Sequence, residues 1–330
     1  MSKVLVTGGA GYIGSHIVRR LSDVGASPVV LDDLRLGHRA AVAGVPLIEA
    51  DFADRGALEE ALGDGTTEFV IHMAAYCEVG QSMEDPASYY ENNVTRSLAL
   101  LDAARRHGVR GIVFSSSAAV YGEPESVPIT EEHPQRPTNP YGETKLAFER
   151  ALAWYNRAHG LSYVALRYFN AAGAHPDGGI GEDHEHETHL VPRLLAAAAE
   201  EGEAMPIFGD DYPTRDGTCV RDYVHVVDLA EAHVLALELM RREPGVGQAF
   251  NLGNGEGFTV REVLDVVEGI VGTRPRTKPA PRRPGDPATL VASAELASRR
   301  LGWQPAYPKL ESIVRTAWNW HRRHPGGYDD

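Results

Sequence analysis

Several features that mark other protein classes are missing from this chain of 330 residues. It has only 2 cysteines, Cys77 and Cys219, which cannot form a disulfide framework and show no paired metal-ligand spacing. No apolar run of about 18 residues occurs, so we expect no membrane span, and no signal-peptide pattern precedes the first strand. The net charge of −14 disfavours nucleic acid and anionic membranes as partners. We therefore expect a cytoplasmic protein.

What the sequence does contain is an alternation of strand and helix patterns. Strands are expected at 3–7, 29–31, 69–72, 111–114 and 163–166, and long helices at 12–24, 89–107 and 141–159. This alternation predicts an α/β fold with a Rossmann-type doubly wound parallel sheet. Past Gly173 the rhythm loosens, which predicts a smaller, discontinuous C-terminal substrate lobe. The expected domains are 1–170 plus about 220–254, and about 171–219 plus 255–330.

The first strand runs into a glycine-rich turn, Thr7-Gly8-Gly9-Ala10-Gly11-Tyr12-Ile13-Gly14. Glycines between a strand and a helix let the backbone approach a pyrophosphate at the helix N-terminus. Asp32 ends the second strand, where a carboxylate accepts hydrogen bonds from an adenosine ribose and disfavours a 2′-phosphate. The pattern predicts NAD as cofactor, although Asp32 also suits a turn or cap. The candidate contacts are Gly8, Gly11, Tyr12, Ile13, Gly14, Asp32 and Asp33.

Two further segments suit the cofactor. Asp51 and Phe52 follow an apolar run, where the carboxylate can accept a hydrogen bond from the adenine amino group or cap a helix. His72-Met73-Ala74-Ala75 ends another strand with small residues. We predict that Met73, Ala74 and Ala75 let a dinucleotide pass close by; a plain strand–helix contact is the alternative.

Tyr141 and Lys145 stand four positions apart at the start of an expected helix. Four residues advance a helix by about 400°, so the two side chains share one face, roughly 6 Å apart. An ammonium at that distance favours the phenolate and lowers the pKa of a tyrosine. Tyr141 is therefore the candidate base for a sugar hydroxyl, with Lys145 as its electrostatic partner.

Three serines, Ser115, Ser116 and Ser117, follow the expected strand at 111–114. Residues past the carboxyl end of a parallel strand point into the ligand crevice. We predict that Ser117 hydrogen-bonds the reacting oxygen and relays its proton to Tyr141, and that Ser115 or Ser116 faces the nicotinamide. Solvation of a loop is the alternative for these hydroxyls.

The ordered motifs Thr-Gly-Gly-Ala-Gly-Tyr-Ile-Gly-Ser-His, Ser-Ser-Ser, Pro-Tyr-Gly-x-x-Lys and Leu-Arg-Tyr-Phe-Asn resemble those of the UDP-glucose 4-epimerases in the extended short-chain dehydrogenase/reductase family. The later Gly-Asp-Asp-Tyr-Pro-Thr-Arg-Asp-Gly-Thr-Cys-Val-Arg-Asp-Tyr and Arg-Arg-Pro-Gly-Asp extend the resemblance into the second lobe. It implies an isomerase that oxidises C4 of a UDP-sugar, lets the 4-keto sugar turn about its diphosphate, and returns the hydride. It also implies a homodimer.

The resemblance assigns further residues by position. Tyr168, Phe169, Asn170 and Asn92 would lie at the nicotinamide and sugar, although Asn92 also suits helix packing. The other implied substrate contacts are Thr188, His189 and Leu190 on the diphosphate, Phe208 on uracil, Arg221 and Arg283 on phosphate, Tyr223 in support, Asp286 on ribose, and Leu290 as a gate for acetamido groups. Arginine forks also match phosphate oxygens on general grounds.

Some features test rival interpretations. The segment from Glu182 to His189 is rich in metal-ligand types, but no helix-borne His-Glu-x-x-His arrangement occurs, so we expect a solvated, substrate-facing loop and no metal. Dehydratases of similar sequence need an acid–base pair where this chain has Ala118 and Ala119. Cys77 is expected to be a buried thiol. Activity on UDP-N-acetylglucosamine or UDP-glucuronate stays open, as does a non-catalytic NAD(H) sensor.

Overall fold

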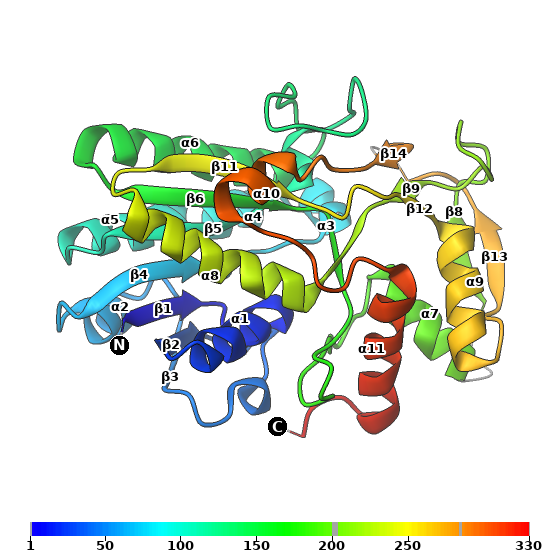
Figure 1. The fold of residues 1–330 in the computed structure, drawn as a ribbon, viewed down its shortest axis with the longest axis horizontal. Coiled ribbons are helices and arrows are strands. Elements are labelled where there is room, and N and C mark those ends of the chain that lie inside the picture. The colour runs from blue at the N-terminus through cyan, green and yellow to red at the C-terminus, as the bar shows by residue number, and fades with distance from the viewer. Residues whose placement is uncertain (1, 200–203, 284–285, 330) are drawn as a thin grey trace.

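The computed structural model describes residues 2–199, 204–283 and 286–329. Its centre is a 7-stranded parallel sheet with the spatial order β11-β6-β5-β4-β1-β2-β3 (Figure 1). The strands are β1 (Lys3–Thr7), β2 (Ser27–Asp32), β3 (Leu47–Glu49), β4 (Thr67–His72), β5 (Gly111–Ser117), β6 (Ser162–Tyr168) and β11 (Gly247–Leu252). This is the Rossmann-type doubly wound sheet that the sequence predicts.

Helices cover both faces of the sheet because its strands are apolar on both sides. Along β1, Val4 and Val6 pack into one core cluster and Leu5 into the other. The first face carries α1 (Tyr12–Asp23), α8 (Val226–Arg242) and α10 (Glu295–Leu301); the second carries α2 (Arg55–Leu62), α5 (Ser97–Arg106) and α6 (Pro140–His159) (Figure 1). The sheet's carboxyl edge is thereby left open for loops.

The segment 89–107, expected as one α-helix, is helical, but a π-helical turn interrupts the α-helix. After α3 (Val79–Glu84), α4 (Pro86–Tyr90) is followed by a π-helical turn, η2 (Glu91–Arg96), and then by α5. The side chain of Asn93 accepts a hydrogen bond from Tyr76 N and donates to Tyr76 O, both at 2.9 Å. Such wide turns often occur at functional sites, and this one lies beside α6.

The second lobe has its own core, formed by α7 (Leu190–Ala199), α9 (Val260–Val271) and α11 (Leu310–Arg323). Its small sheets pair β8 (Met205–Phe208) with β13 (Thr277–Ala280), β7 (Asn170–Ala172) with β10 (Tyr223–His225), and β9 (Val220–Arg221) with β12 (Phe258–Thr259) and β14 (Thr289–Leu290). Pro284 and Gly285 of the Arg-Arg-Pro-Gly-Asp motif lie outside the described residues. None of the described helices is long and apolar enough to cross a membrane.

Candidate functional site

The site residues gather where β1 lies between β4 and β2, because the order of the strands along the chain reverses there. Ligands of open parallel sheets bind outside the carboxyl ends of the strands at such a switch point. The glycine turn follows β1, and residues 73–75 follow β4. Met73 N and Ala74 N both donate to Thr7 O, at 2.9 and 3.1 Å, which fixes the second segment beside the first.

Three of the four glycines of the turn, Gly8, Gly11 and Gly14, differ in what a side chain would meet. Gly8 has φ of 69°, and a Cβ there would lie 2.5 Å from Ala74 N; a Cβ on Gly14 would lie 2.1 Å from Gly8 O. Both glycines are therefore needed for the turn itself. Gly11 has ordinary φ and ψ of −76° and 176°, and its Cβ would meet nothing closer than Gly8 O at 3.5 Å. The open space over Gly11, at the N-terminus of α1, fits a pyrophosphate.

Asp32 is buried at the end of β2 and holds the same turn. Its two carboxylate oxygens accept from Ala10 N at 2.9 Å and from Leu34 N at 3.0 Å. Burial raises the pKa of Asp32, while these two amides oppose the shift. Each oxygen keeps a second lone pair, so a ribose contact stays a prediction. Asp33 instead accepts from Arg35 Nε at 2.8 Å.

Three of the remaining cofactor candidates, Asp51, Phe52 and Asn92, are held by or buried among other residues. Asp51 pairs with Arg96, and its Oδ1 accepts from Ala53 N at 2.8 Å. Phe52 is buried, with its ring 5.1 Å from that of His72. Asn92, in the π-helical turn, is also buried, and its Oδ1 has no hydrogen-bond partner among the described residues. An orphaned acceptor of this kind is what an amide-bearing ligand would satisfy.

Tyr141, Ser117 and Lys145 lie together at the carboxyl end of β5. Asn139 caps α6 by accepting from Gly142 N at 2.8 Å, and Pro140 occupies its first turn. The Ser117 hydroxyl lies near enough to the Tyr141 phenol to lower the pKa of Tyr141, and Ser117 Oγ accepts a hydrogen bond from Ala119 N at 3.1 Å. Lys145 is buried; its Nζ lies 5.7 Å from the centroid of the Tyr141 ring and donates to Ser115 O at 2.7 Å. The structure thus gathers the three predicted catalytic residues.

The electrostatics of this group differ from the sequence-based expectation. Burial raises the pKa of Tyr141 well above its usual value, the Cys77 thiol adds to the shift, and the Ser117 hydroxyl opposes it. Burial also lowers the pKa of Lys145 to about 8. The sequence predicts that the Lys145 ammonium lowers the pKa of this phenol; in the structure burial raises it instead.

The three serines do not follow β5 but form its last residues, so their side chains alternate. Ser116 points into the interior, where it donates to Glu149 Oε1, which also accepts from Arg167 Nε at 3.0 Å. Ser115 and Ser117 point to the other side. This removes Ser116 as an alternative to Ser115 at the nicotinamide.

The last residue of β6, Tyr168, and the two residues that follow it are expected contacts of the nicotinamide and sugar. Tyr168 is buried, with its OH 2.5 Å from His233 Nε2 of α8. Phe169 and Leu290 pack against the same apolar cluster, which includes Tyr121 and Ile129. Asn170 is fixed through its backbone, since its N–H donates to Asp222 O at 2.9 Å. Leu290, the expected gate residue, therefore lies beside one of the expected sugar contacts.

Arg221, at the end of β9, and Arg283 are the two arginines expected at the phosphates. Arg221 is buried and ion-paired with Asp286, which joins the expected phosphate and ribose contacts. Arg283 Cζ lies 4.0 Å from the centroid of Phe208, so the guanidinium stacks on the ring expected at uracil. Tyr223 is buried, and burial raises the pKa of its phenol. Four of the expected nucleotide contacts thus form two pairs: the ion pair of buried Arg221 with Asp286, and the stack of Arg283 on Phe208.

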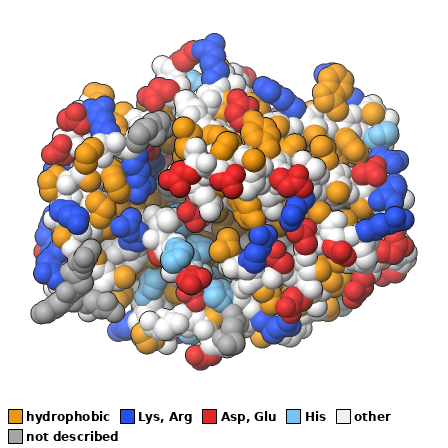
Figure 2. Space-filling model, turned by 180° about the vertical axis from the view of Figure 1, so that it is seen from behind, with side chains coloured by type: hydrophobic (Ala, Val, Ile, Leu, Met, Phe, Trp, Pro, Cys, Tyr) orange, Lys and Arg blue, Asp and Glu red, His pale blue; other side chains and the backbone are white. Residues whose placement is uncertain are grey.

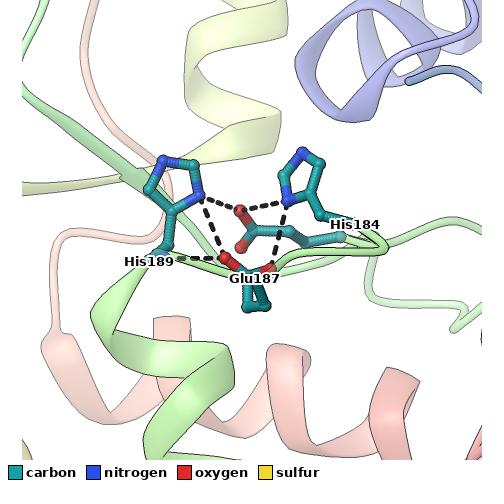
Figure 3. Close-up of side chains that lie close together, drawn as sticks. His184, Glu187 and His189 are labelled. Atoms are coloured by element: carbon teal, nitrogen blue, oxygen red, sulfur yellow. Dashed lines mark hydrogen bonds and ion pairs between the residues drawn. The ribbon is translucent and has the colours of Figure 1, made fainter. Parts of the chain in front are cut away.

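The segment from Glu182 to His189 is not the fully solvated loop that the sequence predicts. Glu182 is only 5% exposed, and its Oε1 lies 2.5 Å from His189 Nδ1. Glu187 Oε2 lies 3.1 Å from His184 Nδ1 (Figure 3). Burial by itself lowers the pKa of His189, but the hydrogen bond to Glu182 acts in the opposite direction, and the pKa is raised to about 9. The face of the molecule opposite to Figure 1 is hollowed, with histidines and acidic side chains gathered at the hollow (Figure 2). Thr188 is exposed and Leu190 begins α7.

Cys77 is exposed rather than buried as expected. It lies close enough to Tyr141 and Lys145 to act on the pKa of each. Its own pKa is raised, chiefly by desolvation, because neighbouring side chains crowd the thiol. The expectation failed because the loop after β4 turns this side chain into the open site.

Sequence reasoning missed several buried polar residues that support the site. Arg167 and Glu149 form a buried ion pair beneath Ser116, with Arg167 NH2 2.6 Å from Glu149 Oε2. Asp222 accepts from Asn254 N at 2.8 Å and from Ala292 N at 3.1 Å, which ties three segments of the second lobe together. A charged residue near the end of an otherwise apolar strand, such as Arg167 in β6, was the available signal.

The chain is similar to known proteins over its whole length. Residues 4–253 match the model of the NAD dependent epimerase/dehydratase family. A UDP-glucose 4-epimerase of Halalkalibacterium halodurans is 52% identical, covering 98% of this chain and 97% of the relative. Among solved structures, UDP-glucose 4-epimerase from Brucella ovis in complex with NAD is 47% identical, with a TM-score of 0.93 and coverage of 97% and 98%. The enzyme from Bifidobacterium longum in complex with NAD+ and UDP is 37% identical, with a TM-score of 0.94 and coverage of 99% and 100%.

Proposed function

The chain belongs to the NAD-dependent epimerase/dehydratase family, and we propose that it is an isomerase that interconverts UDP-glucose and UDP-galactose through a transient 4-keto sugar. The observation that carries the proposal is the group of Tyr141, Ser117 and Lys145 at the carboxyl end of β5, on the same edge of the parallel sheet as the glycine turn after β1. Similarity to UDP-glucose 4-epimerases along the whole chain supports it.

The larger domain, 1–170 plus about 220–254, would hold NAD. Gly8, Gly11 and Gly14 form the turn for the pyrophosphate, Asp32 lies at the ribose, and Asn92 offers its unpaired oxygen. NAD, when bound, supplies a reversible hydride acceptor and a positively charged ring. The buried carboxylate of Asp32 would favour NAD over NADP because it repels a 2′-phosphate.

Tyr141 would remove the proton from the 4-hydroxyl of the sugar and later return it. Ser117 would orient the reacting oxygen, since its hydroxyl lies near enough to the phenol of Tyr141 to act on its pKa. Lys145 is held against Ser115 O, so its ammonium stays within reach of the phenolate when that charge develops. The burial that raises the pKa of Tyr141 also excludes water, which protects a keto sugar from side reactions.

The smaller lobe, about 171–219 plus 255–330, would hold the UDP group while the keto sugar turns over. Arg283 of this lobe and Arg221 from the adjoining segment of the larger domain provide guanidinium forks for the diphosphate, and Phe208 provides a ring for uracil. Thr188, His189 and Leu190 would complete the diphosphate contacts. Anchoring the nucleotide leaves the hexose free to present either face to Tyr141.

A product assay tests the function directly. The purified protein is incubated separately with UDP-glucose, UDP-N-acetylglucosamine and UDP-glucuronate, and each product is identified by chromatography and NMR. We expect UDP-galactose from UDP-glucose; absence of any product would remove the epimerase proposal and favour an NAD(H) sensor. Water loss is not expected, because Ala118 and Ala119 offer no acid–base pair. Product from the acetamido sugar would show that Leu290 admits it.

We also propose a homodimer, in the cytoplasm, in which both cysteines stay free thiols. Helices α5 and α6 pack together on the second face of the sheet and expose apolar side chains, with Leu98 37% and Trp154 66% exposed. We place the interface at these two helices, with Trp154 as the more exposed side chain to test. Trp154→Glu should yield monomers in light scattering after gel filtration; an unchanged mass would remove α6 from the interface.

A further inference from the structure

The loop that leads into α7 gathers two imidazoles and two carboxylates around one point. Glu182, His184, Glu187 and His189 each offer one ligand atom, and these atoms all lie within 4.8 Å of one another. Figure 3 shows the rings of His184 and His189 on either side of Glu187. These residues are the candidate cation ligands among the described part of the chain.

The distances approach those of a tetrahedral metal site. Ligands about 2.1 Å from a zinc ion stand about 3.4 Å apart from one another. In the loop, His184 Nδ1 lies 3.1 Å from Glu187 Oε2 and 3.7 Å from Glu182 Oε1, and His189 Nδ1 lies 3.5 Å from Glu187 Oε1. The contact of 2.5 Å between His189 Nδ1 and Glu182 Oε1 is a hydrogen bond that a metal would replace. Shifts of about 1 Å would complete the geometry.

Residues near the C-terminus also hold this loop in place, so most of the site is formed before a metal ion binds. Glu182 is buried, and its carbonyl oxygen accepts from Trp320 Nε1 at 3.1 Å. Gly181 lies against the Trp320 ring, where a Cβ would come within 2.2 Å of Cγ. Gly181 N donates to Tyr328 OH at 3.0 Å. Helix α11 therefore fixes the first ligand, and the other three follow within seven residues of it.

We propose that Glu182, His184, Glu187 and His189 bind a divalent transition metal ion, with Zn²⁺ as the best match. Two imidazole nitrogens and two carboxylate oxygens form a donor set that zinc accepts. The ion would join the loop to the start of α7 and would raise the stability of the folded protein. None of the four ligands belongs to the group of Tyr141, Ser117 and Lys145, but His189 is also an expected diphosphate contact, so a bound ion would lie at the edge of the proposed substrate site.

Titration of the full-length protein with Zn²⁺, after dialysis against a chelator, tests the site. Calorimetry should show one ion bound per chain, and thermal unfolding should move to a higher temperature with added Zn²⁺. Co²⁺ should give the visible absorption of a four-coordinate site without a thiolate band, which separates these ligands from Cys77.

Matched variants assign the ligands. His184→Ala and Glu187→Gln should each weaken Zn²⁺ binding at least about tenfold, because each removes one of four donors. His186→Ala is the control, since this exposed histidine lies in the same loop outside the cluster; it should bind as the parent does. If His184→Ala fails to fold, Glu187→Gln by itself tests whether the cluster binds Zn²⁺.

Absence of stoichiometric binding in the parent protein would overturn the proposal and leave a closed ion-pair network. So would equal losses in His186→Ala and Glu187→Gln, or a thiolate band with Co²⁺ that disappears in Cys77→Ser.

Discussion

Replacing Gly11 with alanine separates cofactor binding from folding. The backbone at Gly11 suits any residue, and the added Cβ would meet no protein atom closer than 3.5 Å. Alanine is a poorer N-cap but lowers the entropy of the unfolded chain, so the free energy of unfolding should change by less than about 1 kcal/mol. The same methyl would occupy the approach to the pyrophosphate. We expect the affinity for NAD to fall at least about tenfold, or ~1.4 kcal/mol.

Gly14→Ala provides the contrast, because its Cβ would lie 2.1 Å from Gly8 O and the turn must shift. We expect a loss of about 1–3 kcal/mol in unfolding free energy together with loss of NAD. Fluorescence titration with NAD and denaturant unfolding of nucleotide-free protein measure the two effects. Parent-like affinity for NAD in Gly11→Ala would refute the placement of the pyrophosphate over this residue.

Three further predictions concern chemistry, substrate and pH. Tyr141→Phe should lower kcat about 10²–10⁴-fold while NAD stays bound, because only the proton-accepting oxygen is lost; steady-state rates and nucleotide content check this, and near-normal turnover would remove Tyr141 as the base. Arg283→Ala should raise KM for the UDP-sugar with little change in kcat, and an unchanged KM would reject its phosphate role. Burial lowers the pKa of His72 to about 3 and that of His233 to about 4. Their contribution to stability is present above pH 6.5 and is lost on acidification, so unfolding free energy should fall below pH 6.5 by up to about 1.4 kcal/mol per pH unit for each group. Denaturant midpoints that stay constant from pH 6.5 to 5 would contradict this.

Several errors of the sequence-based analysis share one cause. The exposure of Cys77 and the burial in the 182–189 loop depend on how segments far apart in the chain meet, and so does the ion pair of Arg221, for which the sequence predicted no partner. Arg221 and Asp286 are 65 positions apart, and Trp320 supports Glu182 from 138 positions away. No local pattern of apolar and polar residues encodes such meetings, because loops carry little periodicity.

The serines show an error that the sequence could have prevented. Once β5 is extended to Ser117, side-chain alternation alone places Ser116 on the opposite face from Ser115 and Ser117. The strand was expected to end at 114, since serines are common in loops. Burial of Ser116 against Glu149 favours the longer strand.

The sequence by itself determined the order of strands and helices, the glycine turn after β1, and the shared helix face of Tyr141 and Lys145. Each of these follows from spacing within about a dozen residues, where backbone geometry dictates which side chains are neighbours. Only the tertiary structure decided that Tyr141 meets Ser117, that desolvation rather than Lys145 controls the pKa of the phenol, and that four ligand-type side chains converge ahead of α7. Those outcomes depend on packing across the chain, which sets both distance and dielectric surroundings.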